Sequence, residues 1–136
     1  MGVKKLFLVD DDDIFRVASE VLVKYNNLAE EVISFENGLL AFEALMALEH
    51  SPDELPELLF LDINMPIMNG WEFLEEIKEG PEIIRNTVKI HILTSSIDPN
   101  DLVLSKSYDF ISGYIAKPLT DSDINKVAQS LSSATI

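Results

Sequence analysis

The sequence predicts a doubly wound α/β domain, in which a five-stranded parallel sheet lies between two layers of helices. Short apolar runs alternate with segments of helical periodicity along the chain, which is the pattern of repeated βα units. The chain has 136 residues, of which 47% are hydrophobic, and this is enough for one hydrophobic core. We therefore expect residues 1–136 to form a single domain.

Five short apolar runs are the expected strands. In chain order they are KLFLV (5–9), EVISF (31–35), ELLFL (57–61), KIHIL (89–93) and GYIA (113–116). Continuous apolar runs are typical of strands that are covered on both faces. In such sheets ligands bind outside the carboxyl ends of the strands, so the residues that follow each run are the candidates for a functional site.

Five helices are expected between and after these strands. Two of them show a clear apolar stripe at helical spacing, from Ile14 to Tyr25 and from Ile124 to Leu131. Asp98 before Pro99 is typical of a helix start, because Asp caps well and proline fits the first helical position. The weaker signals are Leu45 with Leu48, Leu74 with Ile77, and Thr120 before the last helix. These elements use up the chain, so we expect no separate output domain.

Composition and charge exclude several classes of function. The chain has 10 basic and 24 acidic residues, a net charge of -14, which opposes direct binding to nucleic acid or to an anionic membrane. It has no cysteine, which excludes disulfides and thiolate metal sites. The first apolar run stops at Val9, too early for a signal peptide, and no run is long enough to span a membrane. We expect a cytoplasmic location.

The stretch LFLVDDDD places four aspartates, Asp10 to Asp13, directly after the first expected strand. Each close pair of like charges costs roughly 4 kcal/mol at about 4 Å and an effective dielectric near 20. The row is either a solvated turn at a helix start, with Asp13 as the N-cap, or part of a cation site. A hard cation such as Mg²⁺ would offset the repulsion, because it prefers oxygen ligands.

Polar residues also follow three other strands, and all of them should meet at one edge of the sheet. Asp62 follows the third run, Thr94 the fourth, and Lys117 with Pro118 the fifth. Carboxylates with one lysine and one hydroxyl suit the transfer of a phosphoryl group to an aspartate in the presence of Mg²⁺. The nucleophile would then be a carboxylate, and the product an acyl phosphate.

The third-strand region, LLFLDINMPIMNGWEFLEEI, resembles the receiver domain of bacterial two-component response regulators. The landmarks of that family occur in order: the acidic pair Asp10 and Asp11, the motif LDxxMPxMxG around Asp62, then Thr94, then Lys117 before Pro118. The resemblance covers nearly the whole chain. It implies a flavodoxin-like fold with strand order 2-1-3-4-5, and a receiver of the stand-alone type.

The resemblance also implies a phosphoacceptor and a metal site. Asp62 would receive a phosphoryl group from a phosphohistidine on a sensor histidine kinase or a histidine phosphotransfer protein, as part of a phosphorelay. Mg²⁺ would be bound by Asp11, Asp62 and the backbone carbonyl of Asn64, with Asp10 acting through a metal-bound water. The protein would be a signalling switch rather than an enzyme. Neither Asn64 nor Ser96 is an acid that could position water, so slow autodephosphorylation is expected.

The switch residues implied by the resemblance are Thr94 and Tyr114, and Lys117 acts beside them at the site. Lys117 would bridge to the phosphoryl oxygens, the Thr94 hydroxyl would swing toward them, and the Tyr114 ring would move inward. The face formed by the helix after Asp98, the strand GYIA and the last helix would then shift to bind a downstream protein target. The last helix could also support a homodimer in the phosphorylated state.

One alternative function comes from a different class of protein. Asp10 and Asp12 after a strand, a later Ser or Thr and a lysine also resemble the core of haloacid-dehalogenase-like phosphatases. Asp10 would then be the nucleophile of a hydrolase. Against this, the chain has no room for a cap domain and lacks a late acidic pair after a strand. A phosphorylation experiment that compares Asp10 with Asp62 separates the two hypotheses.

Overall fold

The computed structural model describes residues 2–95 and 98–133 and contains a five-stranded sheet. The strands are β1 (Val3–Val9), β2 (Ala29–Phe35), β3 (Leu58–Asp62), β4 (Lys89–Thr94) and β5 (Ile111–Ala116). Every neighbouring pair is parallel, and the order is β2-β1-β3-β4-β5. The predicted fold class and strand order are therefore confirmed.

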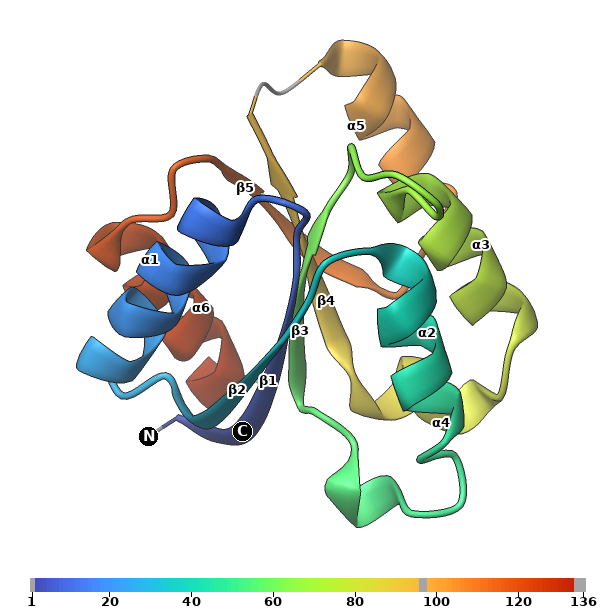
Figure 1. Cartoon of the computed structure of the whole chain (residues 1–136), viewed down its shortest axis with the longest axis horizontal. Coiled ribbons are helices and arrows are strands. Elements are labelled where there is room, and N and C mark those ends of the chain that lie inside the picture. The colour runs from blue at the N-terminus through green and yellow to red at the C-terminus, as the bar shows by residue number, and fades with distance from the viewer. Residues whose placement is uncertain (1, 96–97, 134–136) are drawn as a thin grey trace.

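Helices cover both faces of this sheet (Figure 1). On one side are α1 (Asp13–Tyr25) and α6 (Asp121–Ser133). On the other side are α2 (Gly38–Met46), α3 (Gly70–Glu79), α4 (Glu82–Thr87) and α5 (Pro99–Ser105). A short 3₁₀ helix, η1 (Pro52–Glu54), precedes β3. None of the helices within the described ranges has the length and hydropathy needed to cross a membrane.

The expected number of five helices was wrong, because the described residues contain six α-helices and α4 is the additional one. It is only six residues long, so its sequence shows no repeating stripe. Its Ile84 is fully buried in the core. Arg85 donates hydrogen bonds of 2.9 to 3.0 Å to the carbonyls of Ile77, Lys78 and Gly80, and so satisfies acceptors at the end of α3.

Side chains alternate between two cores along each strand. Phe7 and Val9 of β1 lie in the core under α2 and α3, whereas Leu6 and Leu8 lie in the core under α1 and α6. All five residues of β3, the central strand, are buried. This double coverage explains why the strands appear in the sequence as continuous apolar runs.

The N-cap of α1 is Asp12, so the prediction that Asp13 caps this helix was wrong. One carboxylate oxygen of Asp12 accepts hydrogen bonds from the backbone N–H groups of Ile14 (2.9 Å) and Phe15 (3.1 Å). A cap residue needs non-helical backbone angles, and the backbone of Asp12 is extended (φ -90°, ψ 111°). Asp13 is already helical and pairs with Arg16 one turn later.

Two other predicted helix starts are confirmed. A carboxylate oxygen of Asp98 accepts a hydrogen bond from the N–H of Asn100 (2.8 Å) at the start of α5, where Pro99 is the first helical residue. At the start of α6, the Thr120 hydroxyl accepts from the N–H of Asp123 (3.2 Å), and Asp123 accepts in return from the N–H of Thr120 (3.0 Å). This reciprocal arrangement is a capping box.

Candidate functional site

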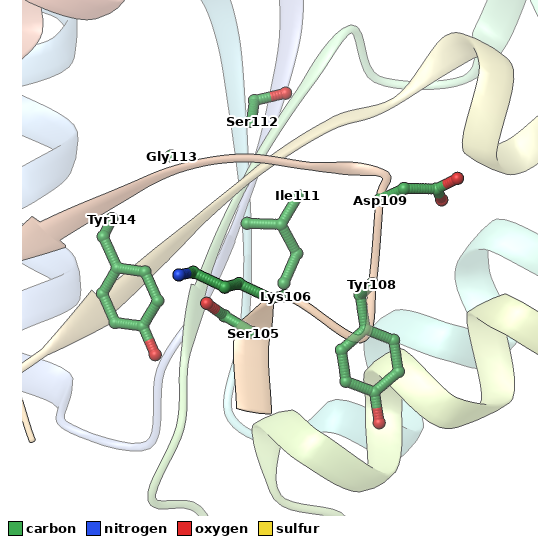
Figure 2. Close-up of a pocket in the computed structure, with 8 residues that line it drawn as sticks. All are labelled: Ser105, Lys106, Tyr108, Asp109, Ile111, Ser112, Gly113 and Tyr114. Atoms are coloured by element: carbon green, nitrogen blue, oxygen red, sulfur yellow. The ribbon is translucent and has the colours of Figure 1, made fainter. Parts of the chain in front are cut away.

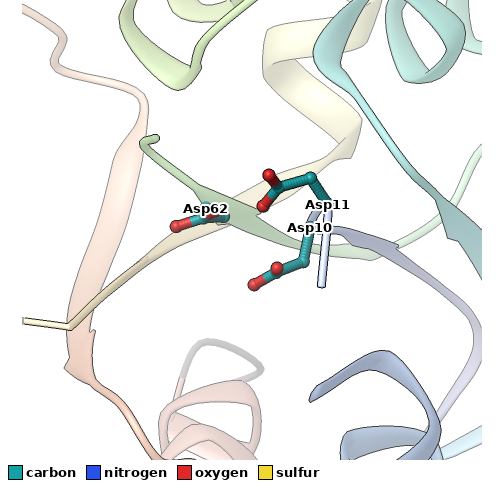
Figure 3. Close-up of side chains that lie close together, drawn as sticks. All are labelled: Asp10, Asp11 and Asp62. Carbon is teal, nitrogen blue, oxygen red and sulfur yellow. The ribbon is translucent and has the colours of Figure 1, made fainter. Parts of the chain in front are cut away.

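Three carboxylates meet at the carboxyl edge of the sheet, as the sequence predicts. Asp10 and Asp11 directly follow β1, and Asp62 is the last residue of the neighbouring strand β3. Each of the three offers an oxygen, and these oxygens lie within 4.8 Å of one another (Figure 3). Asp10 is fully buried and Asp62 is 5% exposed, whereas Asp11 is open to solvent.

Lys117 reaches the same point from the end of β5. Its Nζ lies 2.6 Å from Oδ2 of Asp10 and 3.3 Å from Oδ1 of Asp62. The backbone N–H of Lys117 donates to the carbonyl of Thr94 at 2.7 Å, which ties the ends of β4 and β5 together. A single lysine therefore contacts two of the three carboxylates and occupies a fixed position beside them.

Asp10 is held more firmly than the other two carboxylates. Its Oδ1 accepts a hydrogen bond from the backbone N–H of Asp12 (2.9 Å), and its Oδ2 is paired with Lys117. Its own N–H donates to the carbonyl of Phe35 (3.0 Å) on β2. Both oxygens of Asp10 are thus engaged by the protein, so Asp11 and Asp62 have the freer oxygen atoms.

Burial and charge shift the protonation of this cluster. Burial raises the pKa of Asp62 to about 6, and the neighbouring charge of Asp10 adds to the shift, while Lys117 opposes it. Burial acts to lower the pKa of Lys117, but its hydrogen bonds and charge contacts with Asp10 and Asp62 together outweigh this and raise it. A bound cation would oppose the shift at Asp62, because it favours the charged carboxylate.

The site has the donors that a hard divalent cation requires. Mg²⁺ binds oxygen ligands and retains several waters, so two or three carboxylates and a carbonyl are sufficient. The three carboxylates come together at the mouth of the site, where Asp11 is accessible from solvent. The residues present therefore fit a magnesium ion.

The close packing of the loop between β3 and α3 explains why the predicted motif has a glycine at position 70. A Cβ atom at Gly70 would lie 2.7 Å from the carbonyl oxygen of Asp62 and 2.8 Å from Cα of Ile63. The N–H of Gly70 also donates to the carbonyl of Ile63 at 2.8 Å. Only glycine allows the loop to fold back this closely beneath Asp62. Within the loop, Ile67 has a left-handed backbone (φ 69°) and Asn64 is exposed.

The two predicted switch residues lie at different depths. Thr94 is the buried last residue of β4, one position beyond Leu93, which pairs with Asp62. Tyr114 lies two residues before Ala116, the partner of Thr94 on β5, so it is farther from the edge of the sheet. Among the described residues no group hydrogen-bonds the buried Tyr114 hydroxyl, and burial raises the pKa of Tyr114 to about 12. Ser96 lies outside the described residues.

A hollow of about 340 Å³ lies between the end of α5 and β5 (Figure 2). Tyr114 and Tyr108 are among its lining residues, together with Ser105, Lys106, Asp109, Ile111, Ser112 and Gly113. The Tyr108 hydroxyl donates to Oε2 of Glu75 (2.8 Å), and its ring stacks on Trp71 with centroids 6.2 Å apart. These contacts connect α3, which follows the Asp62 loop, to the segment that lines the hollow.

The structure places Phe15 at the site, and no sequence motif predicts this residue there. The Nζ of Lys117 lies 4.4 Å from the centroid of the Phe15 ring, a cation–π contact. Phe15 falls beside the apolar stripe of α1 in the sequence, and no motif distinguished it from a core residue. Only the packing of α1 against the end of β5 reveals its position.

Comparisons with known proteins agree with this geometry. Residues 6–129 match the response regulator receiver domain family. Response regulator Rcp1 of Synechocystis sp. is 31% identical over 132 residues, which cover 96% of this chain and 87% of Rcp1. Chemotaxis protein CheY of Halobacterium salinarum is 34% identical over 119 residues, which cover 85% of each chain.

Solved structures show the same fold. A two-component response regulator from Cytophaga hutchinsonii superposes with a TM-score of 0.89 at 28% identity, over 98% of this chain and 99% of that one. The Mn²⁺-bound form of Rcp1 superposes with a TM-score of 0.71 at 27% identity, over 96% and 92% of the two chains. With its acidic pocket, its strand order and a family match over nearly its whole length, this chain belongs to the response regulator receiver domain family.

Proposed function

We propose that Asp62 is the phosphoacceptor of this receiver domain and takes its phosphoryl group from a phosphohistidine. The observation that carries the proposal is the position of the Asp62 carboxylate at the edge of the sheet, beside Asp10 and Asp11 and 3.3 Å from the Nζ of Lys117. No other carboxylate of this cluster combines partial access with a contact to the lysine. Asp10 is fully buried, and Asp11 has no such contact.

Asp11, Asp62 and the backbone carbonyl of Asn64 would hold Mg²⁺, with Asp10 acting through a metal-bound water. This assignment is supported by the bonds of Asp10, whose two oxygens are already engaged by the Asp12 N–H and by Lys117. A divalent ion is also bound in the Mn²⁺ form of the relative Rcp1. When bound, Mg²⁺ neutralises the carboxylates and the charge on the transferred phosphoryl oxygens.

In the transfer step, an oxygen of Asp62 bonds to phosphorus while the bond between phosphorus and the donor histidine nitrogen breaks. The imidazole leaves with the electron pair of that bond, and the product is an aspartyl phosphate. Asp62 must be ionised to attack, and Lys117 favours this form because its positive charge opposes the raised pKa. Lys117 is then in place to pair with a phosphoryl oxygen as a point charge.

The phosphorylated form would act by binding another protein. Thr94 and Lys117, whose backbones are joined by a 2.7 Å hydrogen bond, would respond to the new oxygens. Tyr114 would follow by moving inward, which would reshape the hollow between α5 and β5 (Figure 2). The face formed by α5, β5 and α6 would then bind a downstream protein target, or a second phosphorylated copy.

The phosphodonor would be a sensor histidine kinase or a histidine phosphotransfer protein, as is usual for receiver domains. The proposed location is the cytoplasm, where receiver domains typically act. Autodephosphorylation should be slow, because Asn64, two residues beyond Asp62, has no acidic group to position water.

The phosphoacceptor is tested by incubating the protein with Mg²⁺ and a small acyl-phosphate donor, followed by intact-mass spectrometry. We expect one phosphoryl adduct on the wild type and none on Asp62→Asn. Asp53→Asn is the matched control, because Asp53 is an exposed aspartate in η1. If Asp10→Asn loses the adduct while Asp62→Asn keeps it, Asp10 is the nucleophile and the phosphatase hypothesis replaces this one.

A further inference from the structure

His91, in the middle of β4, is a buried titratable residue that lies outside the acidic site. It is 6% exposed, and its ring contacts the Phe60 ring edge-on, with centroids 5.8 Å apart. Phe60 belongs to the core under α1 and α6. Within the described ranges, no group forms a hydrogen bond with the buried Nε2 of His91. A buried polar atom without a partner costs free energy, so folding alone does not account for a histidine here.

A glycine on the neighbouring strand makes room for this imidazole. His91 is paired with Gly113 of β5, and a Cβ atom at Gly113 would lie 3.0 Å from Nδ1 and 3.4 Å from Cε1 of His91. A glycine inside a strand often marks a place where another group approaches the backbone closely. The imidazole therefore lies over the backbone of β5, in space that a side chain at position 113 would occupy.

The imidazole also borders a hollow between β5 and α6. The hollow has a volume of about 270 Å³, and its lining residues are His91, Ser112, Gly113, Tyr114, Ile115, Asp123, Lys126, Val127 and Ser130. Val127 of α6 is 4% exposed and belongs to the same core as Phe60. Movement of the His91 ring out of the core would thus lead between β5 and α6, past residues that hold this helix on the sheet.

The groups on the strands around His91 favour its neutral form. Burial, together with the positive charge of Lys89 on the same strand, lowers the pKa of His91 to about 4. Phe60 of β3 carries no charge. Burial raises the pKa of Tyr114 on β5 to about 12, so its hydroxyl is uncharged at neutral pH. None of these groups balances an imidazolium.

Helix α6 contributes one charge of each sign to the hollow, from Asp123 and Lys126. Oδ2 of Asp123 accepts hydrogen bonds from the N–H and the hydroxyl of Thr120, at 3.0 and 2.9 Å, as part of the helix cap. No ion pair joins His91 to an acidic group in the part of the chain that the structure describes. A protonated His91 in its present position would therefore be a buried charge without a partner, which is strongly unfavourable.

We propose that His91 is an acid-sensitive latch for α6, which stays packed on the sheet while the imidazole is neutral and is released when the imidazole is protonated. The charged ring would leave the core between β5 and α6, where water solvates it, and the packing of Val127 on the sheet would be lost. Helix α6 is part of the face proposed to bind a downstream target, so acidification would also weaken that binding. The latch itself does not depend on phosphorylation of Asp62.

The first test is urea unfolding of the full chain at pH 7.5 and pH 5. An ordinary histidine, with a pKa of 6.5, is mostly protonated in the unfolded chain at pH 5, whereas the buried His91 is mostly neutral. The folded state therefore loses stability as the pH falls below 6.5. Relative to His91→Gln, the unfolding equilibrium constant of the wild type should rise roughly 30-fold between the two pH values.

A second variant and a matched control accompany this measurement. His91→Met also lacks the titrating ring and places an apolar side chain in the core, so it should give the same relative change whatever its stability at neutral pH. His50→Gln is the control, because the His50 side chain is 92% exposed and should titrate alike in both states. Its unfolding constant should keep the same ratio to that of the wild type at both pH values.

Amide hydrogen exchange followed by NMR tests whether α6 is the element that is released. Protection factors correct for the dependence of intrinsic exchange on pH, and local opening gives lower protection than global unfolding. At pH 5 the amide of Val127 should exchange faster than that of Leu8, which is fully buried in β1. The opening constant at Val127 should rise by roughly the same 30-fold from pH 7.5 to pH 5 in the wild type, and stay constant in His91→Gln.

Two results would overturn the latch. If the unfolding constants of wild type and both His91 variants keep a constant ratio between pH 7.5 and pH 5, His91 does not couple protonation to folding. If Val127 exchanges only together with Leu8 at pH 5, protonation of His91 acts on the whole fold, and α6 is not released by itself.

Discussion

The four consecutive aspartates occupy four different environments, which is how the fold accommodates their repulsion. Asp10 is buried and paired with Lys117, whereas Asp11 is exposed at the mouth of the site. Asp12 accepts two backbone hydrogen bonds as a helix cap, and Asp13 forms an ion pair on the surface. Each carboxylate except that of Asp11 has a donor or cation of its own, so Asp11 is the member of the row that is most available to a metal.

The raised pKa of Asp62 makes the stability of the metal-free protein depend on pH. Burial and the charge of Asp10 raise this pKa from 3.8 to about 6. Between these values the folded protein binds a proton that the unfolded chain has released, so this contribution to stability is lost as the pH rises through about 6. Asp62→Asn removes the carboxyl group that titrates in this range. Its stability relative to wild type should therefore increase by about 1–2 kcal/mol between pH 5 and pH 7.5.

Urea unfolding in the presence of EDTA measures this difference. Asp53→Asn serves as the control, because it removes an exposed aspartate and should show no comparable increase. A constant difference between Asp62→Asn and wild type at both pH values would mean that Asp62 does not titrate in this range. Addition of Mg²⁺ should reduce the difference, because the cation favours ionised Asp62.

At the scale of the element, the two adjacent aspartates at the start of α1, Asp12 and Asp13, have different roles. Asp12→Ala should lower the free energy of unfolding by about 1 kcal/mol, because the N–H groups of Ile14 and Phe15 lose their acceptor. Asp13→Ala should cost less, because its ion pair with Arg16 involves a carboxylate that is largely exposed. Urea denaturation of both variants measures the order, and a larger loss for Asp13→Ala would contradict the assignment.

The helices also show where periodicity is informative and where it is not. The stripes of α1 and α6 both predict a helix, yet the stripe of α6 is buried and most of the stripe of α1 faces solvent. Apolar spacing identifies a helix and its apolar side, but the side that meets the sheet depends on all packing partners. Helix α4 is shorter than two turns, so its sequence is too short to show the repeating apolar spacing that predicts a helix.

At the scale of the whole molecule, the site joins four parallel strands whose ends are distant in sequence. Because Asp11 follows β1 and Asp62 ends β3, a cation held by both would link neighbouring strands and bind only the folded state. Mg²⁺ should therefore raise the melting temperature of the wild type, in proportion to the logarithm of its concentration above the dissociation constant. Asp11→Asn should show a clearly smaller increase.

Differential scanning fluorimetry with a Mg²⁺ titration measures these shifts. Asp53→Asn, which lies outside the carboxylate cluster, should respond to Mg²⁺ like the wild type. The same increase for Asp11→Asn and wild type would show that Asp11 is not a ligand. It would leave the phosphoacceptor role of Asp62 to be judged by the phosphorylation experiment.

The sequence by itself determined the fold class, the strand runs and the residues that follow them, because these depend on local periodicity and on short motifs. The resemblance to receiver domains correctly brought Asp10, Asp11 and Asp62 together, since parallel strands place their carboxyl ends at one edge. Only the tertiary structure decided which aspartate caps α1, that Phe15 packs on Lys117, and which side of α1 faces solvent. These features depend on backbone angles and on contacts between segments far apart in the chain, which no local pattern encodes.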